Sequence, residues 1–250
     1  MYPFKKSIIP AIALLLMFSQ HVFAQKISVD TLTISIAGRY ADASIQKLNF
    51  PVINSGNIQN DSAINKDLKN RFTNNEYPEL STDSTIIKWA DEQVVDLNFE
   101  ITYLKDGIIS LNISAEACGA YCSGWTNYYT YNYLTAQYIS IDQVVDTLGK
   151  FRNRVMADKD LQYRQQGAQL KTNLTDRSGE IDNETFQMIN EYYRNCSQSF
   201  HFGSFALHDD YLEIVETCDL PNVVKSLAPE IKLHYQYKDI GSYLKLKLTN

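Results

Sequence analysis

The 250-residue sequence contains few of the motifs that mark an enzyme or a cofactor-binding protein. It has only four histidines, and no two of them have the spacing of a His-Glu-x-x-His zinc site. It also has no Gly-x-Ser-x-Gly nucleophile elbow, no glycine-rich phosphate loop and no Asp-x-Asp-x-Asp-Gly calcium loop. We therefore predict a noncatalytic protein with no catalytic residues, no cofactor and no bound metal.

One segment keeps an enzymatic alternative open. His208, Asp209 and Asp210 are consecutive, and their side chains can ligate a metal or assist proton transfer. Such a site would suit a hydrolase or transferase that acts on envelope glycans. A short polar run between two predicted strands is more typical of a hairpin turn than of an active site. We therefore favour a binding protein over an enzyme. A structural envelope protein without a small ligand is a third possibility.

Cysteine is also scarce, since the chain has four, all at position 118 or later. An even number of cysteines in an exported chain is typical of disulfides, and of the three possible pairings we favour Cys118–Cys122 and Cys196–Cys218. Residues four apart in an extended strand are too distant for a disulfide, so the first pairing requires a tight turn, which Gly119 permits. A four-cysteine zinc site and a Cys-x-x-x-Cys redox pair are the alternatives.

The sequence has a single long apolar run, from Ile8 to Phe18. It follows two lysines and precedes Val22-Phe23-Ala24, an order typical of a cleaved signal peptide over residues 1–24. The run is shorter than the ~20 apolar residues that a membrane-spanning helix needs. We expect a mature chain of residues 25–250, periplasmic or secreted and not inserted in a membrane; an uncleaved anchor is the alternative.

The charge of the chain indicates the kind of partner to expect. The formal net charge is −6, and it becomes −8 once the two lysines of the signal peptide are removed. An acidic chain is a poor match for nucleic acid or an anionic membrane and a better match for a basic protein. The mature length suffices for one large domain, or for two tightly joined halves at about 25–145 and 146–250.

The clearest periodicity in the sequence predicts a β-hairpin. Apolar and polar residues alternate from Val95 to Tyr103 and again from Ile109 to Ala115, with Lys105-Asp106-Gly107 as the turn. Residues 125–133 are expected to add a third strand and residues 137–141 a fourth.

The other segments complete an α+β pattern. A helix capped by Ser62 is expected to carry the apolar stripe Ile64, Leu68 and Phe72, whereas residues 74–84 are interpreted as loop. Helical periodicity extends from about 142 to 195, and strands are expected at 31–40, 44–53, 200–207 with a bulge at 203–204, 211–216 and 231–237. This order predicts antiparallel sheets, an N-terminal meander and a C-terminal hairpin, with helices packed on one side.

The aromatic strand is the best candidate for a binding surface. Alternation places Trp125, Tyr129, Tyr131 and Tyr133 on one face and Tyr128 on the other. Because a sheet has one core side, one of these two faces should be buried and the other should be available to a ligand. Tyrosine and tryptophan are common anchors of protein interfaces, and their flat rings also suit sugars. We therefore expect the contacts to come from Trp125, Tyr128, Tyr129 and Tyr121, held by the Cys118–Cys122 turn.

The order of short motifs resembles a family of extracytoplasmic domains of unknown function. The matching segments are Leu48–Ile53, Ile64–Leu68, Phe99–Tyr103, Ile108–Leu111, Tyr129–Asn132, Tyr138–Val145, Phe205–Leu207, Tyr211–Ile214, Ile231–Leu233 and Asp239–Leu244. Such domains occur in RsiV-type anti-sigma factors and beside the catalytic domain of PdaC-type peptidoglycan deacetylases. The resemblance implies a mixed α+β module.

The resemblance also implies a class of partner. In the anti-sigma member such a module binds lysozyme, a basic protein that attacks the envelope. This chain has no second membrane segment and no deacetylase-like metal motif, so signalling across a membrane and deacetylation are not implied. The expected partner is a cell-envelope glycan or a basic protein such as lysozyme.

Overall fold

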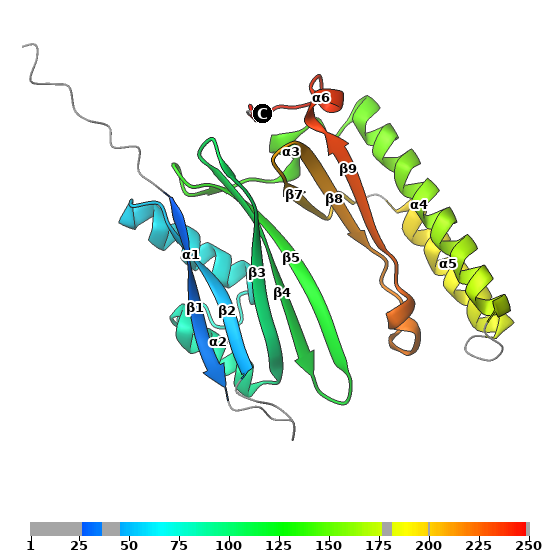
Figure 1. Ribbon diagram of the computed structural model, residues 1–250, viewed down its shortest axis with the longest axis horizontal. Helices are drawn as coiled ribbons and strands as arrows, with labels where there is room; N and C mark the ends of the chain where they lie inside the picture. The colour runs from blue at the N-terminus through cyan, green and yellow to red at the C-terminus, as the bar shows by residue number, and fades with distance from the viewer. Residues whose placement is uncertain (1–26, 37–45, 177–181, 200, 249–250) are drawn as a thin grey trace, which may run out of the picture.

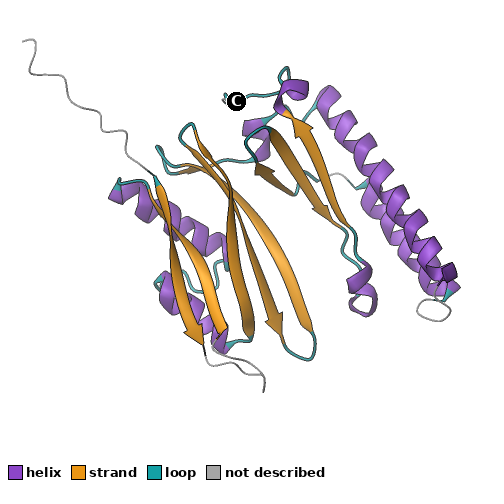
Figure 2. Ribbon diagram, in the orientation of Figure 1, coloured by secondary structure: helices purple, strands orange, loops and turns teal. Residues whose placement is uncertain are grey.

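The computed structural model describes residues 27–36, 46–176, 182–199 and 201–248 (Figure 1). The predicted signal peptide lies outside these residues. Within them, the chain has the predicted α+β architecture, with two sheets and two groups of helices (Figure 2). In the described part of the chain, no helix combines the length and apolar character needed to cross a membrane.

A six-stranded sheet forms the N-terminal part, in the spatial order β1-β2-β3-β4-β5-β6. All neighbouring strands are antiparallel except β2 and β3, which are parallel. The strands are β1 (Ser28–Ile36), β2 (Gln46–Asn54), β3 (Val94–Lys105), β4 (Ile108–Cys118), β5 (Cys122–Asn132) and β6 (Gln137–Tyr138). The predicted meander corresponds to β3 through β6.

Helices α1 (Ile58–Phe72) and α2 (Thr82–Asp91) cover one face of this sheet (Figure 1). The predicted stripe of Ile64, Leu68 and Phe72 is buried against the sheet. The helix begins before the expected cap at Ser62, because the Asn57 side chain accepts hydrogen bonds from the backbone N–H groups of the first turn. Helix α2 was not expected, since part of it lies in the segment interpreted as loop.

The C-terminal part contains the second sheet, in the order β7-β8-β9, with two long helices on one of its faces. The elements are α3 (Ile141–Val144), α4 (Gly149–Asp176), α5 (Asn183–Gln198), β7 (Ser204–Leu207), β8 (Tyr211–Thr217), η1 (Asn222–Leu227), β9 (Glu230–Gln236) and α6 (Tyr237–Ile240). Strand β7 begins only at Ser204, so the expected bulge at 203–204 does not interrupt a strand.

The two sheets meet where β7 approaches β3, β4 and β5. The backbone N–H of Leu207 donates to Ser110 Oγ at 3.0 Å, and Thr130 Oγ1 donates to the same oxygen at 3.1 Å. Ser110 and Thr130 are completely buried. A buried backbone N–H without a partner would be costly, so these hydroxyls allow the edge of one sheet to be buried against the other.

Candidate functional site

The aromatic strand lies in β5, and the structure assigns its two faces. Trp125, Tyr129 and Tyr131 point toward α1 and α2, where they join the N-terminal hydrophobic core. Tyr131 is fully buried and donates a hydrogen bond from its hydroxyl to Asp67 Oδ2 at 2.8 Å. Burial raises the pKa of Tyr131, so its hydroxyl stays protonated. The face with odd residue numbers therefore packs against α1 and α2. The opposite face is also buried where β7 approaches it, because Thr130 is completely buried there, so the expectation that one whole face is open to a ligand is wrong.

The four expected contact residues lie in different surroundings. Tyr129 is only 6% exposed, so its ring is out of reach of a ligand in this conformation. Tyr128 is on the opposite face, where burial and the carboxylates of Glu230, Glu213 and Glu100 raise its pKa to about 12. The remaining two lie toward the disulfide end of the sheet.

Tyr121 lies at the tip of the β4–β5 hairpin, where it is 89% exposed. A disulfide joins Cys118 to Cys122 across this tip, in the pairing that the sequence favoured. The two cysteines face each other directly in the β4–β5 ladder, with Cα atoms 4.0 Å apart. The turn of Gly119, Ala120 and Tyr121 thereby brings together residues that an extended strand would keep apart.

Trp125 is half-buried and lines a surface pocket of about 210 Å³. The other lining residues are Glu76, Trp89, Glu92 and Val94. The rings of Trp125 and Trp89 lie edge to face, with centroids 6.2 Å apart, a favourable arrangement for aromatic pairs. The pocket therefore combines two indole rings with two carboxylates.

Hydrogen bonds position both carboxylates of the pocket. The indole Nε1 of Trp89 donates to Glu76 Oε2 at 2.9 Å, and the hydroxyl of Tyr77 donates to Glu92 Oε1 at 2.5 Å. The bond to Glu92 raises the pKa of Tyr77 to about 12. A carboxylate can accept several hydrogen bonds, so each retains acceptor capacity for a ligand.

The pocket is built where α2 turns into β3. Gln93 has a φ of 89°, a left-handed conformation that reverses the chain between Glu92 and Val94. The backbone N–H of Cys118 donates to the carbonyl of Gln93 at 3.0 Å. This bond connects the pocket to the disulfide end of the β4–β5 hairpin.

No family model and no curated protein sequence matches this chain. Solved structures that share its fold include two DUF3298 family proteins. A DUF3298 family member from Bacteroides fragilis has a TM-score of 0.56 and 10% identity, covering 88% of this chain and 94% of that one. A DUF3298 family protein from Pseudomonas aeruginosa has a TM-score of 0.52 and 12% identity, covering 89% and 96% of the two chains. At these identities the similarity concerns the fold.

The alternative site at His208, Asp209 and Asp210 forms the turn between β7 and β8. Asp209 pairs with Lys105 at 2.9 Å, whereas the ring of His208 stacks on Tyr211 at 4.2 Å. The three side chains therefore do not form one site in this structure.

His208 instead approaches a carboxylate on β8. Its Nε2 atom is buried without a hydrogen-bond partner and lies 3.9 Å from Glu213 Oε1. His234 Nε2 is 2.7 Å from the other oxygen of the same carboxylate. These contacts lower the pKa of Glu213, with His208 as the larger cause.

Sequence reasoning missed Glu76, Trp89 and Glu92. The available signal was the spacing of Ile86, Trp89 and Ala90, which is that of an amphipathic helix face. It missed Glu213 and His234 because they meet through the β8–β9 register, which alternation alone does not reveal.

Proposed function

We propose that this chain is an exported, noncatalytic binding module, and that its partner is a basic protein that attacks the cell envelope, with lysozyme as the test case. The observation that carries the proposal is the pocket of Trp89, Trp125, Glu76 and Glu92. A lysine or arginine side chain from the partner would find aromatic rings and carboxylates together there. Cation–π contacts contribute about 0.5–2 kcal/mol, and charge-assisted hydrogen bonds to the carboxylates would add to this.

The charge of the whole chain supports the same partner. The formal net charge is −6 for the whole sequence and −8 without the two lysines of the predicted signal peptide, and it would attract a basic protein over the range of the Debye length, about 8 Å at physiological salt. The exposed ring of Tyr121 lies at the same end of the β4–β5 hairpin as Trp125 and offers a second aromatic contact. Aromatic residues are enriched among the residues that dominate binding energy at interfaces.

Two further observations support an exported binding role. Two disulfides are typical of proteins in oxidising compartments outside the cytoplasm. The sequence motifs resemble the lysozyme-binding module of RsiV-type anti-sigma factors, and the fold similarity to DUF3298 proteins is compatible with the mixed α+β fold that this resemblance implies.

Calorimetric titration of the purified protein with lysozyme tests the proposal, and soluble peptidoglycan fragments serve as the competing ligand class. We expect binding to lysozyme that weakens as salt increases. W125A should weaken it about tenfold or more, as expected for an aromatic residue at the centre of an interface. E92Q should weaken it less. The matched control is E191Q, which removes a charge from an exposed surface of α5.

The outcomes separate the possible partners. If the protein binds glycan fragments but not lysozyme, the partner of the pocket is an envelope glycan and not a basic protein. No binding to either ligand, or lysozyme binding that W125A and E92Q leave unchanged, would contradict the assignment of this pocket.

A further inference from the structure

The disulfide end of the β4–β5 hairpin brings three potential metal ligands together. The sulfur atoms of Cys118 and Cys122 and a carboxylate oxygen of Glu116 lie within 4.8 Å of one another. Among the residues that the structure describes, this is the one group of at least three histidine, cysteine, aspartate or glutamate side chains that meets this distance. Glu116 and Cys118 are two apart on β4 and Cys122 is directly opposite Cys118, so all three side chains project from the same face.

The hairpin does not depend on the disulfide to keep these groups together. The β4–β5 ladder runs without a break from the pair of Ile108 and Asn132 to the pair of Ala117 and Ser123. At the tip, the N–H of Gly119 donates to the carbonyl of Tyr121 at 3.1 Å, and the N–H of Cys118 donates to Gln93. After reduction the two thiols would therefore remain on adjacent, paired strands.

The surroundings leave space for an ion. Glu116 is opposite Gly124, which has no side chain. A Cβ atom at Gly124 would meet no atom closer than the carbonyl oxygen of Ala115, at 3.7 Å. Cys122 and the three turn residues are exposed, so both a reductant and a hydrated ion can reach the site.

We propose that the reduced form of this chain binds one Zn²⁺ ion through Cys118, Cys122 and Glu116, and that the disulfide is the oxidised, metal-free form of the same site. A dithiol reductant supplies two electrons and two protons, is itself oxidised to a disulfide, and converts the sulfur–sulfur bond into two thiols. Binding of Zn²⁺ then releases the two thiol protons, because the thiolate is the form that ligates.

The donor set favours zinc over other common ions. Thiolates select Zn²⁺ and Cu⁺, whereas calcium and magnesium require several oxygen ligands. A carboxylate oxygen is an ordinary third ligand for zinc, which prefers four ligands in a tetrahedral arrangement. With three protein ligands, water would occupy the fourth position.

The experiment uses the full chain after treatment with dithiothreitol and anaerobic desalting. Alkylation and mass spectrometry identify which cysteines are reduced. Co²⁺ is added first, because thiolate ligation gives a charge-transfer band, and Zn²⁺ is then titrated to displace it. We expect one metal ion per reduced chain and no thiolate–metal band for the oxidised chain.

Two variants determine which residues bind the metal. C118S/C122S retains Cys196 and Cys218, so any remaining thiolate–metal band after reduction would come from the other pair; we expect none. E116Q preserves the size of the side chain but removes its charge. Since loss of an outer-shell partner costs about 10–100-fold in metal affinity, loss of a direct ligand should weaken Zn²⁺ binding at least as much.

Several results would overturn the proposal. They are an absence of Zn²⁺ binding by reduced protein that retains its native circular dichroism spectrum, binding that persists in C118S/C122S, and binding that E116Q leaves unchanged. If the chain unfolds when Cys118 and Cys122 are reduced and Cys196–Cys218 is still intact by alkylation, the ladder does not hold the two thiols together and the proposal is wrong.

Discussion

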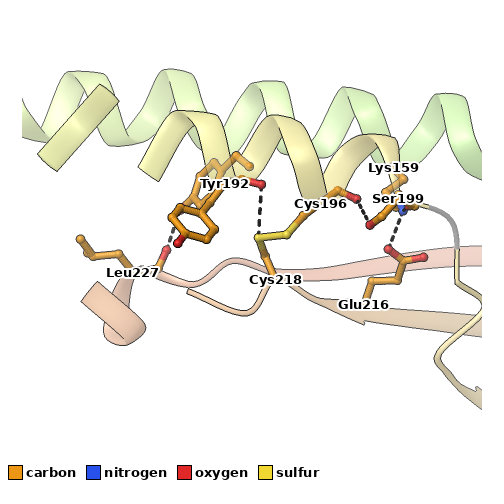
Figure 3. The surroundings of a disulfide bond; sticks show 8 residues. Lys159, Tyr192, Cys196, Ser199, Glu216, Cys218 and Leu227 are labelled. Carbon is orange, nitrogen blue, oxygen red and sulfur yellow. Dashed lines mark hydrogen bonds and ion pairs between the residues drawn. A yellow bond between two sulfur atoms is a disulfide. The ribbon is translucent and has the colours of Figure 1, made fainter. Parts of the chain in front are cut away.

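The two disulfides of this protein have the same chemistry but very different surroundings. Cys118–Cys122 joins two residues that the β4–β5 ladder already places opposite each other, at an exposed tip. Cys196–Cys218 joins the end of α5 to the segment after β8, across 22 positions of sequence (Figure 3). Cys218 is buried, and its sulfur lies 3.6 Å from the carbonyl of Tyr192.

An ion pair accompanies the second disulfide (Figure 3). Lys159 on α4 is completely buried and pairs with Glu216 Oε2 at 2.7 Å, and it also donates to the carbonyl of Ser199. Burial raises the pKa of Glu216, while Lys159 opposes that shift. The comparison indicates that the buried bridge belongs to the framework of the fold, whereas the exposed bridge closes a turn that is already formed.

The largest effect should come from removing the buried lysine. In K159M the Glu216 carboxylate loses its cationic partner and remains buried, so we expect a loss of about 3–5 kcal/mol in the free energy of unfolding. Urea denaturation at pH 7 measures this loss. The double variant K159M/E216Q should recover a substantial part of it, because no unpaired charge then remains.

The deficit of K159M should also depend on pH. Without Lys159 the folded-state pKa of Glu216 rises further above its unfolded value of about 4.3. A carboxyl with a raised pKa favours the folded state below its unfolded pKa, and this contribution is lost as pH rises through the folded pKa. The free energy of unfolding of K159M should therefore be closest to that of the wild type near pH 4 and fall further below it toward pH 8. A deficit constant over this range would contradict the ion-pair explanation.

The next largest effect should follow removal of the buried disulfide. C196S/C218S frees a loop that spans 22 positions, and the chain-entropy model predicts a loss of about 3 kcal/mol. Thermal and urea unfolding of the oxidised variant measure it. If C196S/C218S loses less free energy of unfolding than C118S/C122S, the buried disulfide is not the more important of the two for the stability of the fold.

Removing the hairpin disulfide should cost less. C118S/C122S frees a loop that spans four positions, for which the same model predicts about 2 kcal/mol as an upper value. The ladder constrains this loop in the folded state with or without the bond. We expect native circular dichroism and a smaller shift of the urea midpoint than in C196S/C218S.

The smallest effect should come from the tip itself. Y121A removes a ring that is 89% exposed, so the free energy of unfolding should change by no more than about 0.5 kcal/mol. The same variant should weaken lysozyme binding if the tip contacts the partner. Urea denaturation measures this change. A loss above about 1.5 kcal/mol in the free energy of unfolding would show that the tip is part of the framework of the fold.

Sequence reasoning succeeded where the signal was local. The alternation around the Lys105-Asp106-Gly107 turn predicted β3 and β4, and the parity of the aromatic strand separated Tyr128 from Tyr129 and Tyr131. Alternation works because side chains of a strand point to opposite faces regardless of what the strand packs against.

Most residues of the candidate pocket could not be predicted from local sequence patterns. Glu76 and Trp125 are 49 positions apart, and they meet through Trp89 of α2, which donates a hydrogen bond to Glu76 and packs its ring against Trp125. Trp125 was expected as a contact, but its neighbours were not. The left-handed conformation of Gln93 also carries no sequence signal, because glutamine has no special preference for it.

The contact between Leu207 and Ser110 has a consequence for the order in which the protein forms. The two residues are 97 positions apart, so at about 5–20 residues per second a ribosome needs roughly 5–20 s to make the second after the first. During that interval the sheet face around Ser110 has no partner. Until β7 has been synthesised, the hydroxyl groups of Ser110 and Thr130 can form hydrogen bonds with water. An exposed apolar patch at the same place would favour association with other incomplete chains.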